Sequence, residues 1–296
     1  MKTLLFIYNP HAGKGGIKTR LAGILSVFAG AGYLVTAYPT QGKADATRVT
    51  AALGSDYDRI VCAGGDGTLS EIISGLMELE QRPVLGYIPT GTTNDFARNL
   101  LLPRGMEKQA AAAVCGVPRP CDMGRFNDRP FLYVAAFGAF TDVAYDTPQE
   151  FKNVFGHLAY VLEGMGRLGS LKSYPLRVEH DGGVLEGDFL FGMVSNTVSV
   201  GGFKGLPTKD IKLDDGLFEV VLVRQPAKAA DYQAILRAFT LRIPSFEGPV
   251  TAFRSATIRV HCPEVLPWTL DGEYGGAPAL AEIENCRHAV TIMHGR

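Results

Sequence analysis

The sequence has no hydrophobic run long enough to cross a membrane and no excess of charge of either sign. Its longest apolar stretch, residues 131–145, is interrupted by Gly138, Thr141 and Asp142, and falls short of the roughly 18 apolar residues of a spanning helix. Lys and Arg number 29 against 30 Asp and Glu, which gives a formal net charge of −1. Such a chain has no basic field to hold DNA or RNA. We therefore expect neither a transmembrane segment nor a nucleic-acid partner.

Cysteine is also scarce, and no metal-binding spacing occurs. The five cysteines are scattered, and none of them forms a C-x-x-C pair: Cys62, Cys115, Cys121, Cys262 and Cys286. This pattern supports neither a disulfide framework nor a zinc ribbon, and it fits a reducing cytosol. The first apolar run ends at Asn9-Pro10, which is shorter than the roughly 7–15 residues of a signal-peptide core. We expect a cytoplasmic protein.

The 296-residue length predicts two domains. In residues 1–124, apolar strand-like runs alternate with helical patterns, which predicts an α/β domain with a parallel sheet. The expected strands are 4–8, 34–38, 59–63 and 84–88, and the expected helices are 17–30, 44–53, 69–79 and 95–101.

Residues 125–296 predict a β-rich, sandwich-like domain, whose last strand is free to return to the first domain. Short apolar runs are separated there by Gly, Asp and Asn, and residues 180–184 fit a hairpin turn. The expected strands are 131–137, 176–179, 188–194, 218–223, 257–260, 279–283 and 289–293, and the expected helices are 150–168 and 227–239. We expect the ligand site in a cleft between the two domains.

The most informative segment is Cys62-Ala63-Gly64-Gly65-Asp66-Gly67-Thr68-Leu69-Ser70-Glu71, in which glycines surround one aspartate between a strand and a helix. Glycines let a backbone approach a ligand closely, and helix N-termini favour anions. A carboxylate beside phosphates would repel them unless a cation lay between, so Asp66 indicates a Mg²⁺-nucleotide site. The alternatives are structural: Thr68 and Glu71 have capping-box spacing, and Asp66 also fits a tight turn with a solvated carboxylate.

Two familiar nucleotide-binding fingerprints are missing. Residues 65–70 lack the third glycine of a dinucleotide-binding fold, and the sequence has no G-x-x-x-x-G-K-[ST]. A nucleotide must therefore be held in another way.

Two further segments follow the first and the fourth expected strands. Residues 8–16 offer small residues, backbone N–H groups and the cation of Lys14, although a plain loop would also explain them. Residues 88–98 contain three threonines with a glycine and an Asn94-Asp95 pair, of which either member could simply N-cap the next helix. Because parallel strands end at one edge of their sheet, all three segments should converge there.

Six stretches, spread over nearly the whole chain, match the motifs of one family in order. They are Asn9-Pro10-x-Ala12-Gly13-Lys14, Gly64-Gly65-Asp66-Gly67-Thr68-Leu69-x-Glu71, Pro89-x-Gly91-Thr92-Thr93-Asn94-Asp95-Phe96-Ala97-Arg98, Cys121-Asp122-x-Gly124, Asp214-Asp215-Gly216-x-Phe218 and Leu270-Asp271-Gly272-Glu273. The sequence thereby resembles the diacylglycerol kinase catalytic-domain family, which includes bacterial soluble diacylglycerol kinases and sphingosine kinases. The first motif occurs in other kinases too, whereas the combination is highly specific.

This resemblance implies an α/β nucleotide domain and a β-sandwich domain, with ATP and substrate in the cleft between them. The implied ATP-site residues are Asn9, Pro10, His11, Ala12, Gly13, Lys14, Thr40, Gly64, Gly65, Asp66, Gly67, Thr68, Leu69, Ser70, Glu71, Thr92, Asn94, Asp95 and Arg98. It further implies that Asp66, Asp95 and Asp122 organise Mg²⁺ and water around the phosphates, with Asp66 counted among the catalytic residues.

Two acidic turns in the second half take their implied roles from the same resemblance. Glu273 would be the general base on a lipid hydroxyl, with Asp271 beside it. Spacing alone treats the two acids alike, because i and i+2 share a face if the segment is extended. Asp215, with the backbone carbonyls of Lys212 and Leu217, would hold a second, structural Mg²⁺. On the residues alone, both segments fit ordinary turns.

The predicted function is that of an ATP- and Mg²⁺-dependent lipid kinase that visits the membrane surface and phosphorylates diacylglycerol or a similar lipid. A sphingoid base, undecaprenol or another long-chain alcohol remains open as acceptor, and a homodimer remains open as assembly. The alternatives are an NAD kinase-like small-molecule kinase and a non-catalytic lipid- or nucleotide-binding regulator. The regulator would be expected to lose Asp66 or the Asp271/Glu273 pair, and all three residues are present.

Overall fold

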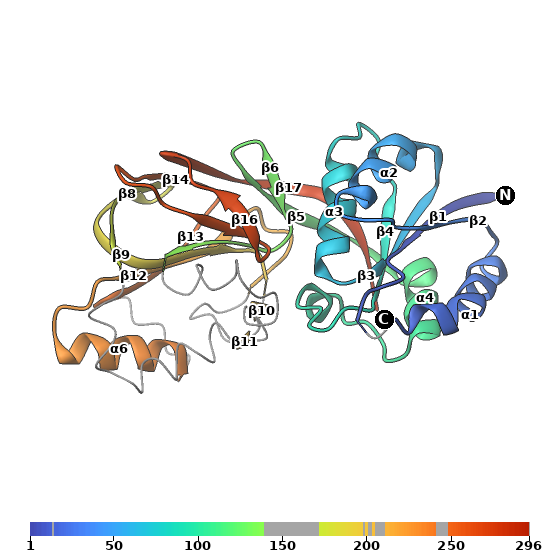
Figure 1. Ribbon diagram of the computed structural model, residues 1–296, viewed down its shortest axis with the longest axis horizontal. Coiled ribbons are helices and arrows are strands. Elements are labelled where there is room, and N and C mark those ends of the chain that lie inside the picture. The colour runs from blue at the N-terminus through green and yellow to red at the C-terminus, as the bar shows by residue number, and fades with distance from the viewer. Residues whose placement is uncertain are drawn as a thin grey trace. The chain divides into compact units, whose positions relative to one another are not determined.

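The computed structural model describes residues 1–13, 15–138, 172–197, 199–200, 203–204, 211–240 and 248–295. It divides into two compact units, one of residues 1–123 with 287–296 and the other of residues 124–286. Figure 1 shows the helix-rich first unit and the strand-rich second unit. None of the helices within the described ranges is long and apolar enough to span a membrane. The predicted fold class, a parallel α/β part followed by a β-rich part, is confirmed.

The first unit is built on four parallel strands in the order β4-β3-β1-β2. Its elements are β1 (Lys2–Tyr8), α1 (Ile17–Gly30), β2 (Tyr33–Pro39), α2 (Asp45–Leu53), η1 (Gly54–Asp56), β3 (Arg59–Gly64), α3 (Asp66–Met77), β4 (Val84–Pro89), η2 (Phe96–Leu100) and α4 (Met106–Cys115). The pairs α1/α4 and α2/α3 cover opposite faces of these strands (Figure 1). The central strands are therefore apolar on both sides, as in other parallel sheets.

The helices of this unit differ from the sequence prediction in three places. The predicted helix 69–79 begins at Asp66, directly after an extended Gly65, and the predicted helix 95–101 is a 3₁₀ turn, η2. Helix α4 was not predicted, because its alanines give little hydrophobic contrast. These small side chains bring α4 very close to β4, since a Cβ on Gly86 would lie 2.6 Å from the Cβ of Ala113.

The second unit is mainly antiparallel. Its elements are β6 (Arg129–Phe131), β7 (Val134–Gly138), β8 (Tyr174–His180), β9 (Gly183–Ser195), β10 (Ser199–Val200), β11 (Phe203–Lys204), β12 (Phe218–Arg224), α6 (Ala229–Thr240), β13 (Val250–Ser255), β14 (Thr257–His261), β15 (Trp268–Leu270) and β16 (Glu273–Gly276). The predicted hairpin joins β8 and β9, where His180 pairs with Gly183. The core centres on Trp268, whose ring lies 4.8 Å from that of Phe137 and 5.1 Å from that of Phe126.

Strands β5 (Val117–Phe126) and β17 (Leu280–His294) each contribute residues to both units. The predicted strands 279–283 and 289–293 are thus one long strand, which pairs with β14 in its first half and with β4 at Ile292. The predicted strand 131–137 is instead divided into β6 and β7. The predicted helix 150–168 lies outside the described residues.

Candidate functional site

Three loops leave the carboxyl edge of the parallel sheet and lie against one another. They follow β1, β3 and β4, and hydrogen bonds at their first residues continue the ladder: Asn9 N–H donates to Ala63 O and Thr90 N–H donates to Gly64 O, both at 2.8 Å. The loops therefore start side by side. The structure brings together the segments that the sequence analysis placed at one edge.

Glycines make this close approach possible. A Cβ on Gly13 would lie 2.3 Å from Thr90 O, and a Cβ on Gly91 would lie 2.6 Å from the Cα of Gly65. Gly13 also has a φ of +57°, which L side chains rarely adopt. Any side chain at Gly13 or Gly91 would force the loops apart. The three loops thus form a cradle lined by backbone, which we call the glycine cradle: Gly13, Gly65 and Gly91.

Two helices begin directly after this cradle. The N-cap residues of α1 and α3 are Gly16 and Gly65, and neither has a side chain that could accept a hydrogen bond from the first turn. Amide groups at such helix ends form ready sites for anions, to which the helix dipole adds attraction. The first turn of α1 contains no acidic residue. The edge therefore suits a phosphate group; Lys14, the predicted cation, lies outside the described residues.

The Asp66 carboxylate joins two of the loops. Its Oδ2 accepts a hydrogen bond from Asp95 N–H at 2.9 Å, and its Oδ1 accepts one from Phe96 N–H at 3.3 Å. Asp66 is half-buried at the start of α3, and these two hydrogen bonds order the start of η2. Asp95 is itself 2% exposed, and its Oδ1 lies 3.7 Å from Arg98 Nε. Two carboxyl groups thus lie next to the glycine cradle.

Several predicted ATP-site residues use their side chains within the protein. Asn94, with a φ of +50°, closes its turn by accepting from Gly91 N–H at 3.0 Å and donating to Gly91 O at 2.8 Å. Asn9 donates to Thr68 Oγ1 at 3.4 Å and accepts from His11 N–H at 2.9 Å. Leu69 is fully buried. The side chains of Asn9 and Asn94 thus shape the loops. Thr92, in contrast, is exposed.

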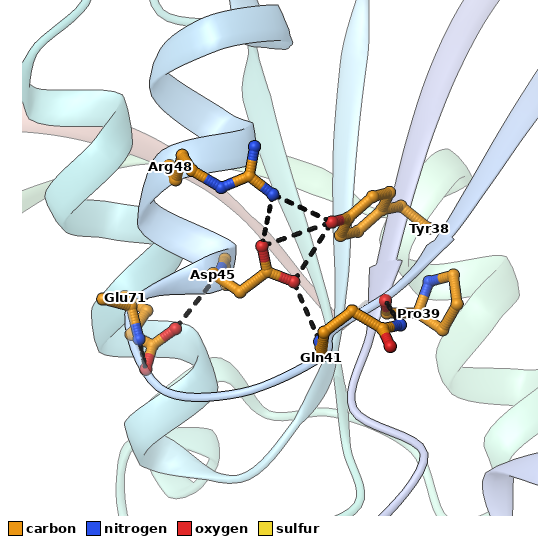
Figure 2. Close-up of polar contacts among 8 residues, drawn as sticks. Tyr38, Pro39, Gln41, Asp45, Arg48 and Glu71 are labelled. Carbon is orange, nitrogen blue, oxygen red and sulfur yellow. Dashed lines mark hydrogen bonds and ion pairs between the residues drawn. The ribbon is translucent and has the colours of Figure 1, made fainter.

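The capping-box alternative for residues 68–71 is wrong. In a capping box the Glu71 carboxylate would return to the N-terminus of its own helix, α3. Instead its two oxygens accept hydrogen bonds from Ala44 N–H at 2.9 Å and Ala46 N–H at 3.2 Å, at the start of α2 (Figure 2). Sequence spacing cannot reveal this bond, because its partners lie 25 to 27 residues away along the chain.

Asp122 lies on β5 and is fully buried. Its Oδ1 accepts a hydrogen bond at 2.7 Å from the N–H of His288, a residue of β17 with a φ of +53°. Among the described residues, no three His, Cys, Asp or Glu side chains lie close enough to hold a metal ion by themselves. Mg²⁺ usually binds proteins through one or two carboxylates together with substrate phosphates. The adjacent Asp66 and Asp95 fit that mode.

Asp271 and Glu273 differ in surroundings, and their segment is not extended but forms the turn that the residues alone allowed. Leu270 pairs with Glu273 across a two-residue turn, in which Asp271 and Gly272 have φ values of +52° and +89°. This is the turn that an Asp-Gly pair favours. Asp271 accepts hydrogen bonds from the N–H groups of residues 132–134 at 2.6 to 3.2 Å, whereas Glu273 is exposed. Asp271 thus holds the bend that divides β6 from β7.

The turn before β12 also carries paired acids. Asp215 Oδ1 accepts from Leu217 N–H at 3.1 Å, and its Oδ2 lies 3.9 Å from Arg254 Nη1. Glu219 is fully buried, 3.3 Å from Arg254 Nε, and its oxygens accept no hydrogen bond from any described residue. Burial raises the pKa of Glu219 to about 7, against the attraction of Arg254 and with added repulsion from Asp215. Asp215 is thus the carboxylate that this turn offers to a cation, and the guanidinium of Arg254 offsets part of its negative charge.

Comparisons with known proteins agree along the whole chain. The model of the family described as "Diacylglycerol kinase catalytic domain" matches residues 3–126, and that described as "YegS C-terminal NAD kinase beta sandwich-like domain" matches residues 137–293. The chain is 37% identical to a diacylglycerol kinase of Bacillus subtilis, with coverage of 99% of this chain and 97% of the relative. It is also 37% identical to a diacylglycerol kinase of Staphylococcus carnosus, with coverage of 93% and 90%. A crystal structure of a diacylglycerol kinase from Bacillus anthracis superposes with a TM-score of 0.79 at 26% identity, and covers 99% of this chain and 97% of that one.

Proposed function

Because the chain belongs to the diacylglycerol kinase catalytic-domain family, we propose that it transfers the γ-phosphate of ATP, with Mg²⁺, to the hydroxyl of diacylglycerol or a similar lipid. Relatives named diacylglycerol kinase span nearly its full length, which supports kinase activity. The observation that carries the nucleotide site is the glycine cradle, where a Cβ on Gly13 or Gly91 would collide with a neighbouring loop.

The protein's own groups account for nucleotide binding. Backbone N–H groups of the cradle and of the first turns of α1 and α3 hold the phosphates. Gly16 and Gly65, the N-cap residues of these helices, have no side chain that would accept hydrogen bonds from the same N–H groups. Lys14 supplies a cation for the same phosphates. Thr40, whose N–H donates to Tyr8 O at 2.9 Å, and Thr92 supply hydroxyls from the neighbouring strand ends. The arrangement replaces the P-loop that the sequence lacks.

Asp66 and Asp95 are the carboxylates that would hold the metal beside the phosphates, and Asp122 would act on it through water. A Mg²⁺ ion held there would supply positive charge that offsets the negative charge of the phosphate groups. Asp66 would hold the metal from a fixed position, because two backbone N–H groups orient its carboxylate. Preorganised charge of this kind needs no reorganisation during reaction.

The two acids of the β15–β16 hairpin take separate roles. Asp271 Oδ1 and Oδ2 already accept three backbone hydrogen bonds, so its carboxylate positions the turn. Glu273 is the exposed acid that follows the turn, and it accepts the proton of the lipid hydroxyl. The substrate is membrane-embedded, so the protein works from the cytoplasm by transient contact with the membrane surface.

Acceptor choice is tested by incubating purified protein and radiolabelled ATP with mixed micelles of diacylglycerol, sphingosine or undecaprenol, with and without Mg²⁺. We expect label in the diacylglycerol product and none when Mg²⁺ is chelated. Label on sphingosine or undecaprenol alone would show that diacylglycerol is not the acceptor. Phosphoryl transfer that persists in EDTA would show that the reaction does not need Mg²⁺.

A separate prediction concerns the second metal site at Asp215, Lys212 O and Leu217 O. A ligand that binds only the native state stabilises it by mass action, by about 1.4 kcal/mol at ten times its Kd. Without nucleotide, Mg²⁺ should therefore raise the melting temperature of wild-type protein, and Asp215→Ala should remove this increase. Asp214→Ala, which removes the neighbouring exposed acid, serves as the control. An unchanged Mg²⁺ response in Asp215→Ala would leave Asp215 as a turn residue.

A further inference from the structure

A row of polar side chains crosses three neighbouring strands of the second unit. Glu219 of β12 pairs with Ser195 of β9 on one side and with Arg254 of β13 on the other. Residues that pair directly across antiparallel strands point to the same face of the sheet, so these three side chains lie in line. Ser195 and Glu219 are fully buried, and the chain neighbours of Glu219, Phe218 and Val220, belong to the apolar core. A charged pair thus lies in a largely buried part of the sheet.

The burial of Glu219 is unfavourable for folding by itself. Both of its oxygens are buried, and within the described ranges neither accepts a hydrogen bond. The Nε of Arg254 lies 3.3 Å from Glu219 Oε1. A buried ion pair offsets the loss of hydration only where its geometry is good and further hydrogen bonds satisfy the remaining lone pairs. Stabilisation of the fold therefore does not explain why a carboxylate is placed here.

Arg254 also reaches Asp215, the carboxylate of the proposed second metal site. Its Nη1 lies 3.9 Å from Asp215 Oδ2, whereas Asp215 Oδ1 accepts a hydrogen bond from Leu217 N–H at 3.1 Å. The Asp215 side chain is 21% exposed and that of Glu219 is fully buried, so water screens the attraction to Glu219 less. One guanidinium is thus shared between two acids, and it lies closer to Glu219.

We propose that Glu219 and Arg254 set the affinity of the Asp215 site for a divalent cation. The guanidinium of Arg254 competes with the cation for the Asp215 carboxylate, because two positive groups at this distance repel each other. Glu219 attracts the guanidinium and thereby leaves the Asp215 carboxylate available to the cation. The inference rests on the second metal site of the proposed function.

The quantity that tests this inference is the dissociation constant of Mg²⁺ for nucleotide-free protein. It is obtained from the increase in melting temperature with Mg²⁺ concentration, and Asp215→Ala supplies the part of the response that does not come from this site. Burial raises the pKa of Glu219 to about 7, so measurements at pH 8.5 keep its carboxylate ionised. Low salt leaves the charges little screened.

Removal of each charge should shift the dissociation constant in opposite directions. Glu219→Gln should raise it about 3- to 10-fold, because Arg254 then has only Asp215 as an ionic partner in this row. Arg254→Gln should lower it by a similar factor, but this variant leaves a buried carboxylate without its partner and is strongly destabilised. The double variant removes both charges, and it should bind Mg²⁺ about 3- to 10-fold more tightly than wild type. A double variant that binds no more tightly than wild type, or a Glu219→Gln variant that binds no more weakly, would overturn the proposal.

The matched control is the ion pair of Arg259 and Glu282. These residues also face each other across two antiparallel strands, β14 and β17, with Nε and Oε1 3.0 Å apart, but their side chains are exposed. Arg259→Gln and Glu282→Gln remove the same charges from the same unit, and each should leave the dissociation constant of Mg²⁺ within about twofold of wild type. Shifts as large as those of the Glu219 and Arg254 variants would show a general effect of charge and would overturn the proposal.

A second readout follows Arg254 directly. In protein with ¹⁵N-labelled arginine, the Nε–H resonance of Arg254 is assigned by its absence from the spectrum of the double variant. It should shift when Mg²⁺ is added to wild-type protein and should stay in place in Asp215→Ala. A resonance that does not respond to Mg²⁺ in wild type would overturn the proposal.

These measurements need neither nucleotide nor lipid, so they separate this inference from the kinase activity. Wild-type protein that binds Mg²⁺ through Asp215 and phosphorylates no lipid would overturn the proposed function, while the opposite shifts of the two variants would still support the inference. Wild-type protein whose melting temperature responds to Mg²⁺ no differently from that of Asp215→Ala would overturn the second metal site and the inference together.

Discussion

Asp66→Asn is expected to lower kcat by at least about 10²-fold, the scale seen when a preorganised charge-stabilising group is removed. The carboxylate directly follows Gly65 of the glycine cradle, and it joins the β3 loop to the start of η2. Asparagine keeps the shape, but removes the negative charge that would hold the metal, and its amide nitrogen cannot accept from a backbone N–H. Single-turnover and steady-state assays would separate the loss of chemistry from a loss of ATP affinity.

The control for this variant is Asp58→Asn. Asp58 also accepts a backbone hydrogen bond, from Thr3 N–H at 2.7 Å, but it precedes β3 and so lies at the opposite, amino edge of the sheet. The Asp58→Asn variant should therefore retain kinase activity although it loses a comparable hydrogen bond. Equal losses of kcat in both variants would mean that Asp66 matters only as a structural cap. A kcat of Asp66→Asn near that of wild type would show that Asp66 does not hold a catalytic metal.

Glu273→Gln is expected to lower kcat by at least about 10²-fold with little change in the KM for ATP, because a positioned base contributes about 10²–10⁴-fold. A lipid hydroxyl is a poor nucleophile until a base accepts its proton. Glutamine has nearly the same size and remains hydrogen-bonding, but it cannot accept that proton. Initial rates at saturating ATP and varied diacylglycerol would measure the effect.

Two further variants sharpen the test. Glu186→Gln changes another exposed glutamate of the second unit, on β9, and should leave kcat unchanged. Asp271→Asn should lower thermal stability, because its carboxylate accepts three backbone N–H groups. If Glu273→Gln remains active while Asp271→Asn is folded and inactive, the base is Asp271. If both remain active, the base lies elsewhere and Asp66 becomes the next candidate.

The fold of the first unit could be predicted from the sequence because its pattern is local. Strands β1, β3 and β4 are short apolar runs followed by Asn9-Pro10, Gly64-Gly65 and Pro89-Thr90, so their carboxyl ends, and hence the three loops, could be located. Gly13, Gly65 and Gly91 lie where the loops approach one another closely, whereas the approach of glycines to a ligand stays a prediction. The motif resemblance is confirmed by family matches and relatives over nearly the full length.

The features that could not be predicted from the sequence depend on contacts between residues far apart in the chain. The Glu71 bonds to α2 and the Asp271 bonds to residues 132–134 join segments 25 to 139 positions apart. For Glu71, spacing indicated a capping box, which these distant partners override. For Asp271, the residues alone allowed the hairpin turn that the structure shows, but not its bonds to residues 132–134. Helix α4 was not predicted, because its close packing against Gly86 requires small side chains, and these leave little hydrophobic periodicity in the sequence.

The central claim is phosphoryl transfer to a lipid hydroxyl, and its most direct measurement is a competition in one reaction. Purified protein, Mg²⁺ and γ-labelled ATP are incubated with diacylglycerol micelles and NAD together, and the organic and aqueous phases are then separated. The account predicts label in the organic phase as phosphorylated diacylglycerol, with none on NAD and almost none with Asp66→Asn protein. Label on NAD alone, with an unlabelled organic phase, would contradict it.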